Sequence, residues 1–334
     1  MEKILLLIHT EPDGSLGRPA LEALAAAISL GGELTVGMVG ANVAAAAQQI
    51  GACGATRMLA VSGEAFGQPR YATDAAATEA LCREAGAQLV LAPATSRWCR
   101  ALPGAALRLN GRIDTHVTAM ALENGVPAVT RWFYRQRMEA VLTRTVRPWF
   151  VLLDAGCRAP WEGGPAAAQV ETLEVAPPET RTTAMGIQAP PEAEQTIRPD
   201  ARLLFVAGAG WTKKQADGAV HAAEAERLIL GFLRASGASL GGSKSLVDLS
   251  GEGQAVLPCM THLNQVGQTG ATPRHPKGLS TCCHGEEPHT VGWRFIHERR
   301  AVNLDPNCGW ARGKADVLYV ADAFEVVRKL IELV

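Results

Sequence analysis

The first part of the chain alternates short apolar runs with longer segments of helical periodicity. The apolar, β-rich runs lie at residues 3–9, 34–40, 56–61 and 88–94, and the Ala/Leu-rich segments between them lie at 18–30, 42–50 and 73–86. Short strands that alternate with helices predict a parallel sheet with helices packed on its faces. We therefore expect an α/β fold in which this sheet is doubly wound and mostly parallel.

The alternation stops after about Gly111. Residues 128–136, 138–146 and 148–155 follow one another as apolar-rich runs, with no helical segment between them. Consecutive strands joined by short connections form antiparallel pairs. The sequence thus predicts three antiparallel strands that complete an N-terminal domain at residues 1–158.

A second domain is predicted after a connection. Residues 159–200 are rich in proline and show little periodicity beyond a possible strand at 170–175, which indicates a linker. The strand and helix alternation then resumes at 202–210, within 217–235, at 299–305, at 316–322 and at 323–333. We expect residues 201–334 to form another α/β domain with a doubly wound, mostly parallel sheet.

The charge of the chain limits the kinds of partner that it is expected to bind. The formal net charge is −1 and no long basic block is present, so the sequence gives no indication of nucleic-acid binding. Five arginines, Arg131, Arg135, Arg137, Arg144 and Arg147, cluster in the presumed hairpins. We expect them to form a solvated face or to meet an acidic patch on a partner subunit.

Targeting and redox signals are weak. The first nine residues are typical of a buried strand and lack the cleavage site of a signal peptide, and no apolar run approaches the length of a membrane span. We expect a cytoplasmic protein without direct membrane insertion. Eight cysteines are scattered without the spacing of a disulfide scaffold, which favours reduced thiols.

The first strand of the second domain ends in Gly208, Ala209 and Gly210. Glycines at a strand-to-helix turn allow backbone N–H groups to approach a phosphate. The third glycine of the dinucleotide fingerprint is absent, and no convincing acid follows about twenty residues later. An NAD-dependent dehydrogenase is therefore the weaker interpretation of this turn.

The run QVGQTG at residues 265–270 resembles the flavin-binding loop of the electron transfer flavoprotein alpha subunit family. The resemblance extends over nearly the whole chain, through residues 21–36 and 90–96 and then through Ser243 and residues 301–306. It implies an alpha subunit that holds one FAD mainly in a Rossmann-like C-terminal domain. This subunit would pair with a beta subunit, and the beta subunit would bind the AMP. It also implies an electron carrier without substrate chemistry, which passes electrons from a flavoprotein dehydrogenase to an acceptor.

The resemblance assigns cofactor contacts to individual residues. The positions that it matches are Ser243, Lys244, Gln265, Val266, Gly267, Gln268, Thr269, His284, Gly285, His289, Asn303 and Asp322. The Ser243 hydroxyl and the backbone N–H groups of Val266, Gly267 and Gln268 would bind the diphosphate without adding charge. Thr269 would donate near the N5 and O4 edge of the flavin ring.

The other matched residues have structural alternatives. His289 matches a histidine beside the pyrimidine carbonyl, where a donor favours the reduced ring, but a lone histidine is most often a surface or structural residue. Asn303 and Asp322 match positions near the adenosine, where a carboxylate accepts from ribose hydroxyls. Asn303 is equally typical of a turn, and Asp322 of a helix N-cap.

Three departures from the family lie close to the flavin. Lys244 stands where the family has an arginine, so the planar fork is lost. His284, with Gly285 beside it, stands in place of a phosphate-binding serine, and two acids that follow would repel a diphosphate unless they point outward. An alternative is therefore a flavin-poor scaffold or docking subunit. In that alternative, a metal or iron–sulfur site could use Cys259, Cys282, Cys283 and Cys308.

Overall fold

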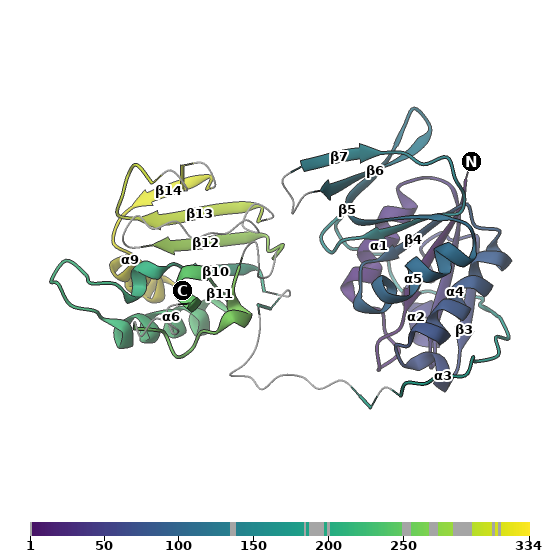
Figure 1. Ribbon diagram of the computed structural model, residues 1–334, viewed down its shortest axis with the longest axis horizontal. Helices are drawn as coiled ribbons and strands as arrows, with labels where there is room; N and C mark the ends of the chain where they lie inside the picture. Colours follow the sequence, from purple (N-terminus) through teal and green to yellow (C-terminus); the bar gives the residue numbers. More distant parts are fainter. Residues whose placement is uncertain are drawn as a thin grey trace. The chain divides into compact units, whose positions relative to one another are not determined.

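The structure is a computed structural model that describes residues 2–133, 138–183, 185–186, 197–198, 201–248, 255–266, 273–282, 296–308, 311–312 and 315–334. The chain folds into two compact units, Met1–Gly186 and Ile187–Val334. Each unit contains a mostly parallel sheet with helices packed against it (Figure 1), so the predicted α/β class is confirmed. None of the helices formed by the described residues is both long and apolar enough to cross a bilayer.

The first unit is built on a nine-stranded sheet with the order β7-β6-β5-β8-β4-β1-β2-β3-β9. Its strands are β1 (Lys3–His9), β2 (Glu33–Gly40), β3 (Arg57–Ser62), β4 (Leu89–Pro93), β5 (Arg112–Glu123), β6 (Val126–Phe133), β7 (Met138–Leu142), β8 (Trp149–Leu153) and β9 (Glu171–Thr172). Pairing is parallel throughout, except where β6 pairs antiparallel with β5 and with β7.

Helices cover both faces of this sheet. They are α1 (Arg18–Ile28), α2 (Ala44–Gln49), α3 (Glu64–Gly67), α4 (Tyr71–Ala85) and α5 (Ser96–Arg108). In β1, Ile4, Leu6 and Ile8 pack in the core cluster that contains α1 and α2. The alternate residues Leu5 and Leu7 pack in the cluster that contains α3, α4 and α5. A parallel strand buried on both faces has a continuous apolar sequence, which is why this strand was predictable.

The structure corrects the predicted direction of the third late strand. Residues 128–136 and 138–146 contain the antiparallel pair β6 and β7, as expected, but residues 148–155 form β8, which runs parallel to both β4 and β5. After β5 the chain forms β6 and β7 at one end of the sheet, and it then returns to form β8 between β4 and β5. β7 and β8 therefore follow one another in the sequence but are separated in the sheet by β6 and β5.

Strand β5 carries a buried carboxylate that ties this hairpin to the sheet. Asp114 is 1 % exposed. It accepts hydrogen bonds from Arg131 Nη1, Arg144 Nε and Trp149 Nε1, each at 2.9 Å. Two of the five clustered arginines therefore bind a carboxylate of their own chain, which corrects the expectation of a wholly solvated face.

The other arginines of that cluster divide into two groups. Arg147 forms an ion pair with Glu2, which lies just before β1. Arg135 and Arg137 lie outside the described residues. Ion pairing within the chain thus accounts for three of the five positive charges.

Residues 161–173, which we call the strap, belong to the first unit and lie against its preceding elements, although the sequence predicts a linker over 159–200. Trp161 N donates to Leu21 O at 3.1 Å, and Ala166 N donates to Gln48 O at 3.0 Å. At its end the strap forms β9, which pairs parallel with β3. The boundaries of the predicted linker remain a prediction, but these contacts attach its first part to the preceding domain.

We expect Gly51→Ala to destabilise the first unit by displacing the strap. A Cβ on Gly51 would lie 2.1 Å from Ala166 O and 2.7 Å from Ala166 C, and both are backbone atoms that cannot rotate away. Overpacking of this kind costs about 1–3 kcal/mol of unfolding free energy. Urea unfolding measures it. Gly164→Ala, in the strap but with nothing within 4 Å of the added Cβ, is the control that should leave the midpoint nearly unchanged.

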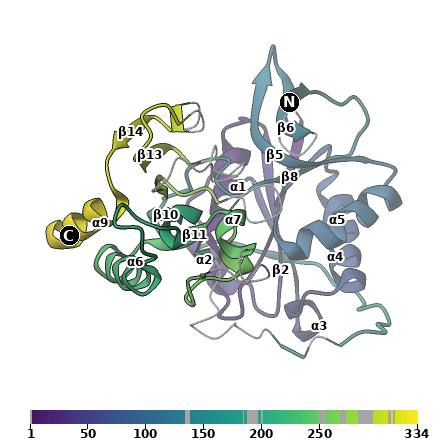
Figure 2. The ribbon, with the colours of Figure 1, turned by 60° about the vertical axis from the view of Figure 1, so that its left-hand side comes forward.

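The second unit contains a five-stranded, fully parallel sheet with the order β11-β10-β12-β13-β14. Its strands are β10 (Leu203–Ala207), β11 (Ser239–Gly242), β12 (Lys277–Cys282), β13 (Glu298–Asn303) and β14 (Val317–Val320). Its helical elements include η2 (Ala209–Thr212), α6 (Ala222–Ser236), α7 (Lys244–Asp248), η4 (His262–Asn264) and α9 (Ala323–Leu333). Figure 2 shows α6 and α9 as neighbours, and both pack on the same face of the sheet.

Candidate functional site

The carboxyl edge of the second sheet gathers the predicted residues that the structure describes. All five strands run in the same direction, so their carboxyl ends share one edge. The strand order reverses between β10 and β12, because β11 lies on one side of β10 and β12 on the other. In open α/β sheets, ligands bind at such a reversal, outside the carboxyl ends of the strands.

Ser243 and Lys244 follow β11 directly. Ser243 is 1 % exposed, and its backbone N–H donates to Ala207 O at 2.9 Å, which fixes it beside the end of β10. Its Oγ accepts from Leu246 N at 3.3 Å, and a hydroxyl that accepts one hydrogen bond still has its proton to donate. Lys244 is exposed at the same edge and supplies a positive charge there.

Gln265 and Val266 lie next to these residues. Val266 N donates to Gly242 O at 2.9 Å, which corrects the expectation that this N–H binds the diphosphate, because it is already used within the protein. Gly242 and Gln265 form an isolated parallel bridge. The approach is close, since a Cβ on Gly241 would lie 2.7 Å from Val266 Cγ2. The structure thus brings Ser243, Gln265 and Val266 together at the end of β11, with Lys244 following in the chain.

Asn303 and Asp322 lie farther along the edge. Asn303 ends β13, is buried, and accepts from Asp305 N through Oδ1 at 2.8 Å, as a turn residue does. Asp322 Oδ1 accepts from Phe324 N at 2.7 Å and from Glu325 N at 3.2 Å. Asp322 is therefore the N-cap of α9, the structural role that its sequence position allowed. A ligand role for either residue stays a prediction.

Six residues of the predicted set lie outside the described residues. They are Gly267, Gln268, Thr269, His284, Gly285 and His289. Their assigned contacts with the diphosphate and with the flavin ring remain predictions.

The glycine turn after β10 is packed into the protein. Gly208 N donates to Thr281 O at 2.8 Å, and Trp211, which is fully buried, donates from Nε1 to Thr281 Oγ1 at 2.8 Å. The turn continues as the short helix η2, whose residues are all buried, and α6 begins only at Ala222. No long helix therefore starts at the turn to face a phosphate, which argues against the NAD-dependent interpretation.

Two of the four cysteines proposed as metal ligands pack in different core clusters. Cys259 packs against the core cluster that contains Phe205, while Cys308 belongs to the cluster that contains Leu204 and Val206. Adjacent residues of one strand face opposite sides, so these two thiols lie on opposite faces of the sheet. Within the described part of the chain, no group of three or more metal-ligating side chains is assembled.

The structure does not test whether the other two cysteines of that set bind a metal. The side chain of Cys282 and all of Cys283 lie outside the described residues. Burial and the neighbouring Glu226 carboxylate raise the pKa of the Cys259 thiol to about 12, so this thiol stays protonated at neutral pH. The placement of Cys259 and Cys308 in clusters on different faces of the sheet argues against a site that uses all four cysteines.

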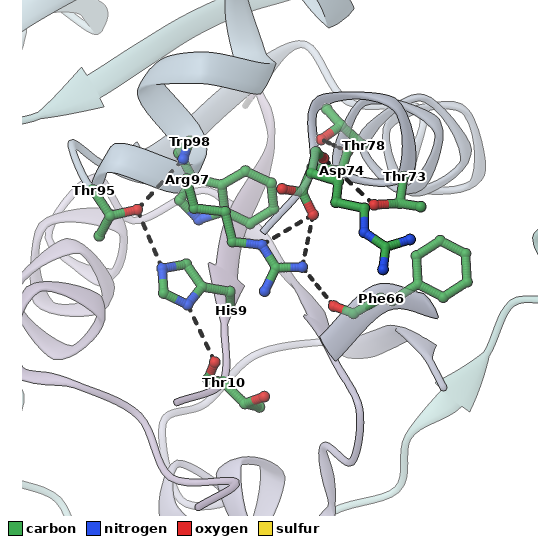
Figure 3. A network of polar contacts seen from close by, with 10 residues as sticks. His9, Thr10, Phe66, Thr73, Asp74, Thr78, Thr95, Arg97 and Trp98 are labelled. Carbon is green, nitrogen blue, oxygen red and sulfur yellow. Dashed lines mark hydrogen bonds and ion pairs between the residues drawn. The ribbon is translucent and has the colours of Figure 1, made fainter. Parts of the chain in front are cut away.

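The first sheet also reverses its strand order, between β1 and β4, and there the protein's own side chains occupy the edge (Figure 3). Arg97 donates from Nε and Nη2 to Asp74 Oδ1 at 2.9 and 2.6 Å, and from Nη2 to Phe66 O at 2.5 Å. His9 Nε2 lies 3.2 Å from Thr95 Oγ1. Burial and the Arg97 charge lower the pKa of His9, which keeps its ring neutral at neutral pH. Sequence reasoning missed this network because no motif links its members.

A cavity of about 510 Å³ lies nearby, at the carboxyl ends of β2 and β3 and beside the strap. The polar side chains in its lining are Asn42, Gln48, Ser62 and Thr172, and the remaining lining residues are alanine and valine. None of these lining residues is charged. The cavity therefore offers no cation to a phosphate-bearing ligand, unlike the edge of the second sheet with Lys244.

The comparisons with known proteins agree with the fold of the first unit. A family model described as the electron transfer flavoprotein domain matches residues 4–178, which is more than half of the chain. The matched range covers the nine strands of the first sheet except the first residue of β1, and it includes the strap. No curated protein sequence matches the chain.

Proposed function

The chain belongs to the electron transfer flavoprotein family, and from this membership we propose that it is the alpha subunit of a heterodimeric carrier. In this role it takes electrons from a flavoprotein dehydrogenase through a bound FAD and delivers them to an acceptor. The beta subunit completes the heterodimer and holds AMP. The proposal extends to a cytoplasmic location and to the absence of substrate chemistry.

One observation carries the proposal. The chain enters residues 267–270, the core of the matched flavin loop, directly from Val266, and Val266 is hydrogen-bonded to the end of β11 beside Ser243. Both segments resemble the flavin-binding segments of the family in sequence, and they are more than twenty residues apart in the chain. Their adjacency supports a single binding edge.

The donor set at this edge suits FAD. When bound, FAD supplies the two-electron redox chemistry, and the protein positions and tunes it. Ser243 has a hydroxyl proton to donate and Gln265 has a side-chain amide, so the diphosphate would meet neutral donors. Lys244 adds one positive charge, which favours an anionic ligand.

The length of the edge also favours an elongated ligand. Between β11, which precedes Ser243, and β13, which ends at Asn303, lie β10 and β12. With about 4.8 Å between neighbouring strands, the two residues are separated by about 14 Å across the sheet. Asp322, after β14, lies one strand farther. A dinucleotide that reaches from Ser243 to the Asn303 side would occupy this length, whereas a single mononucleotide would leave part of it uncovered.

The proposal predicts that the chain co-purified with its beta subunit is yellow, with one FAD per heterodimer, and that Lys244→Glu weakens FAD binding about tenfold or more. The substitution replaces an attractive charge with a repulsive one at the binding edge. Equilibrium titration of the flavin-depleted complex with FAD, followed by absorbance, measures the change.

Lys277→Glu is the matched control. Lys277 begins β12 and so lies at the opposite, amino edge of the same sheet, where it is paired with Glu298 at 3.7 Å. The same charge change there should leave the FAD dissociation constant within about twofold. A heterodimer purified without flavin contradicts the proposal and supports the flavin-poor scaffold, and equal losses in the two variants place the cofactor elsewhere.

A further inference from the structure

The segment Leu257–Val266 delivers the chain to residues 267–270 and is attached at three points. Cys259 N donates to Glu226 Oε1 on α6 at 2.9 Å. Val266 N donates to Gly242 O at 2.9 Å. Between these two points lies η4, and its last residue, Asn264, makes the third attachment through its side chain.

Asn264 is 6 % exposed, and both ends of its amide are used. Its Oδ1 accepts from Thr261 N at 3.1 Å, and Thr261 Oγ1 accepts from Leu263 N at 3.2 Å, so the two residues close a capping box around η4. Its Nδ2 donates to Leu240 O at 3.2 Å. One side chain therefore shapes the turn and fastens it to β11.

The position of this attachment couples two parts of the candidate site. Leu240 precedes Ser243 by three residues, and Asn264 precedes Val266 by two. The amide thus fixes the start of the loop relative to the Ser243 hydroxyl. β11 and the segment that contains Val266 are packed closely, since a Cβ on Gly241 would lie 2.7 Å from Val266 Cγ2. A shift of about 1 Å in a positioned group is enough to weaken a binding site strongly.

We propose that Asn264 is a positioning residue for the cofactor: it holds the loop that begins at Gln265 in register with Ser243 and Lys244, and so sets how tightly FAD binds. Asn264 acts through the backbone that it fixes and is not itself a ligand. This inference rests on the proposed function, because it presupposes that FAD binds at this edge.

The test compares Asn264→Leu with Glu226→Ala in the intact heterodimer. Leucine has a similar size but loses both hydrogen bonds and leaves Leu240 O and Thr261 N without a partner. Glu226→Ala removes the attachment at Cys259, seven residues before Val266, and leaves the capping box intact. Both variants should unfold at lower urea concentration than the wild type.

Only Asn264→Leu should raise the FAD dissociation constant, by about tenfold or more, while Glu226→Ala stays within about twofold of the wild type. In the flavin-free complex, amide hydrogen exchange at Thr261 and Val266 should accelerate in Asn264→Leu and not in Glu226→Ala. If Asn264→Leu does not fold, Asn264→Ser, which keeps a short polar side chain, takes its place in the same comparison.

The outcomes separate the two proposals. Wild-type affinity in Asn264→Leu, or an equal loss in both variants, overturns the positioning role while the flavin carrier stands. A wild-type heterodimer that binds no FAD overturns the proposed function and the positioning role with it.

Discussion

Arg97→Met should lower the free energy of unfolding by about 3–5 kcal/mol, because it leaves a buried carboxylate without its counter-charge. Asp74 is fully buried in α4, and the Arg97 guanidinium provides its ion pair. The substitution also removes the donor to Phe66 O. Urea unfolding of the chain, followed by tryptophan fluorescence, measures the loss.

The loss should depend on pH in a defined direction. Burial raises the pKa of Asp74 above its usual value, in spite of the hydrogen bonds from Arg97. A carboxyl group with a raised folded-state pKa favours the folded state when protonated, and that contribution is lost as pH rises through the folded pKa. Without Arg97 the pKa rises further, so the destabilisation should be smaller at about pH 5 than at about pH 8.

Two variants complete this test. Asp74→Leu combined with Arg97→Met replaces the pair by apolar side chains and should recover most of the loss, since a buried ion pair and an apolar pair of similar volume are often equally stable. Arg83→Met, at an exposed position of α4, should change the unfolding free energy by less than about 0.5 kcal/mol. An equally large loss in the double variant would show that packing, and not the unpaired charge, is responsible.

Asp114→Ala should also cost about 3–5 kcal/mol, because it leaves Arg131 and Trp149 Nε1 without their acceptor. These partners lie on β6 and β8, so the loss should be local to the hairpin and the strands that flank it. Hydrogen exchange in β5, β6 and β8 should accelerate, while exchange in the second unit stays unchanged. Glu123→Ala, at an exposed position of β5, is the control that should have little effect.

Acid should remove the contribution of Asp114. Burial acts to raise the pKa of this carboxyl, but hydrogen bonds from Arg144, Trp149 and Arg131 outweigh it, and the pKa lies below its usual value. Such a group stabilises the fold above the unfolded-state pKa of about 3.9, and this stability is lost as pH falls through the folded pKa. The difference between wild type and Asp114→Ala should therefore shrink below about pH 4. A difference that persists unchanged in acid would contradict this account.

The sequence predicts the parallel strands well where both faces are buried. β1, β2 and β4 have the continuous apolar sequences that this environment requires. β5 was missed because its sequence mixes Asp114, His116 and threonines among apolar residues, and His116 has a φ of 55° at an irregularity in the register. α5 was missed because it contains Pro103 in its interior. Tertiary contacts stabilise both elements against their local sequence preference.

The candidate site is predictable only in part. The resemblance predicts Ser243 and Gln265 in one site; the structure places the two residues next to each other, while their contact with a cofactor stays a prediction. Asn264 has no such signal, because its importance lies in a hydrogen bond to Leu240, 24 residues away. The buried pair of Asp74 and Arg97 is similarly invisible, since nothing local distinguishes these two from solvated charges. Partners that are distant in sequence are set by the sheet order, which a single sequence does not encode directly.

The strap has a practical consequence for how the chain can be divided. Because β9 is the outermost strand beside β3, a protease that cuts before Trp161 would release an N-terminal fragment with that flank of the sheet uncovered. Cleavage just after Gly186 would instead leave all nine strands on one fragment. Fragments that end after the strap should remain monodisperse, and those that end before it should associate through the bare flank.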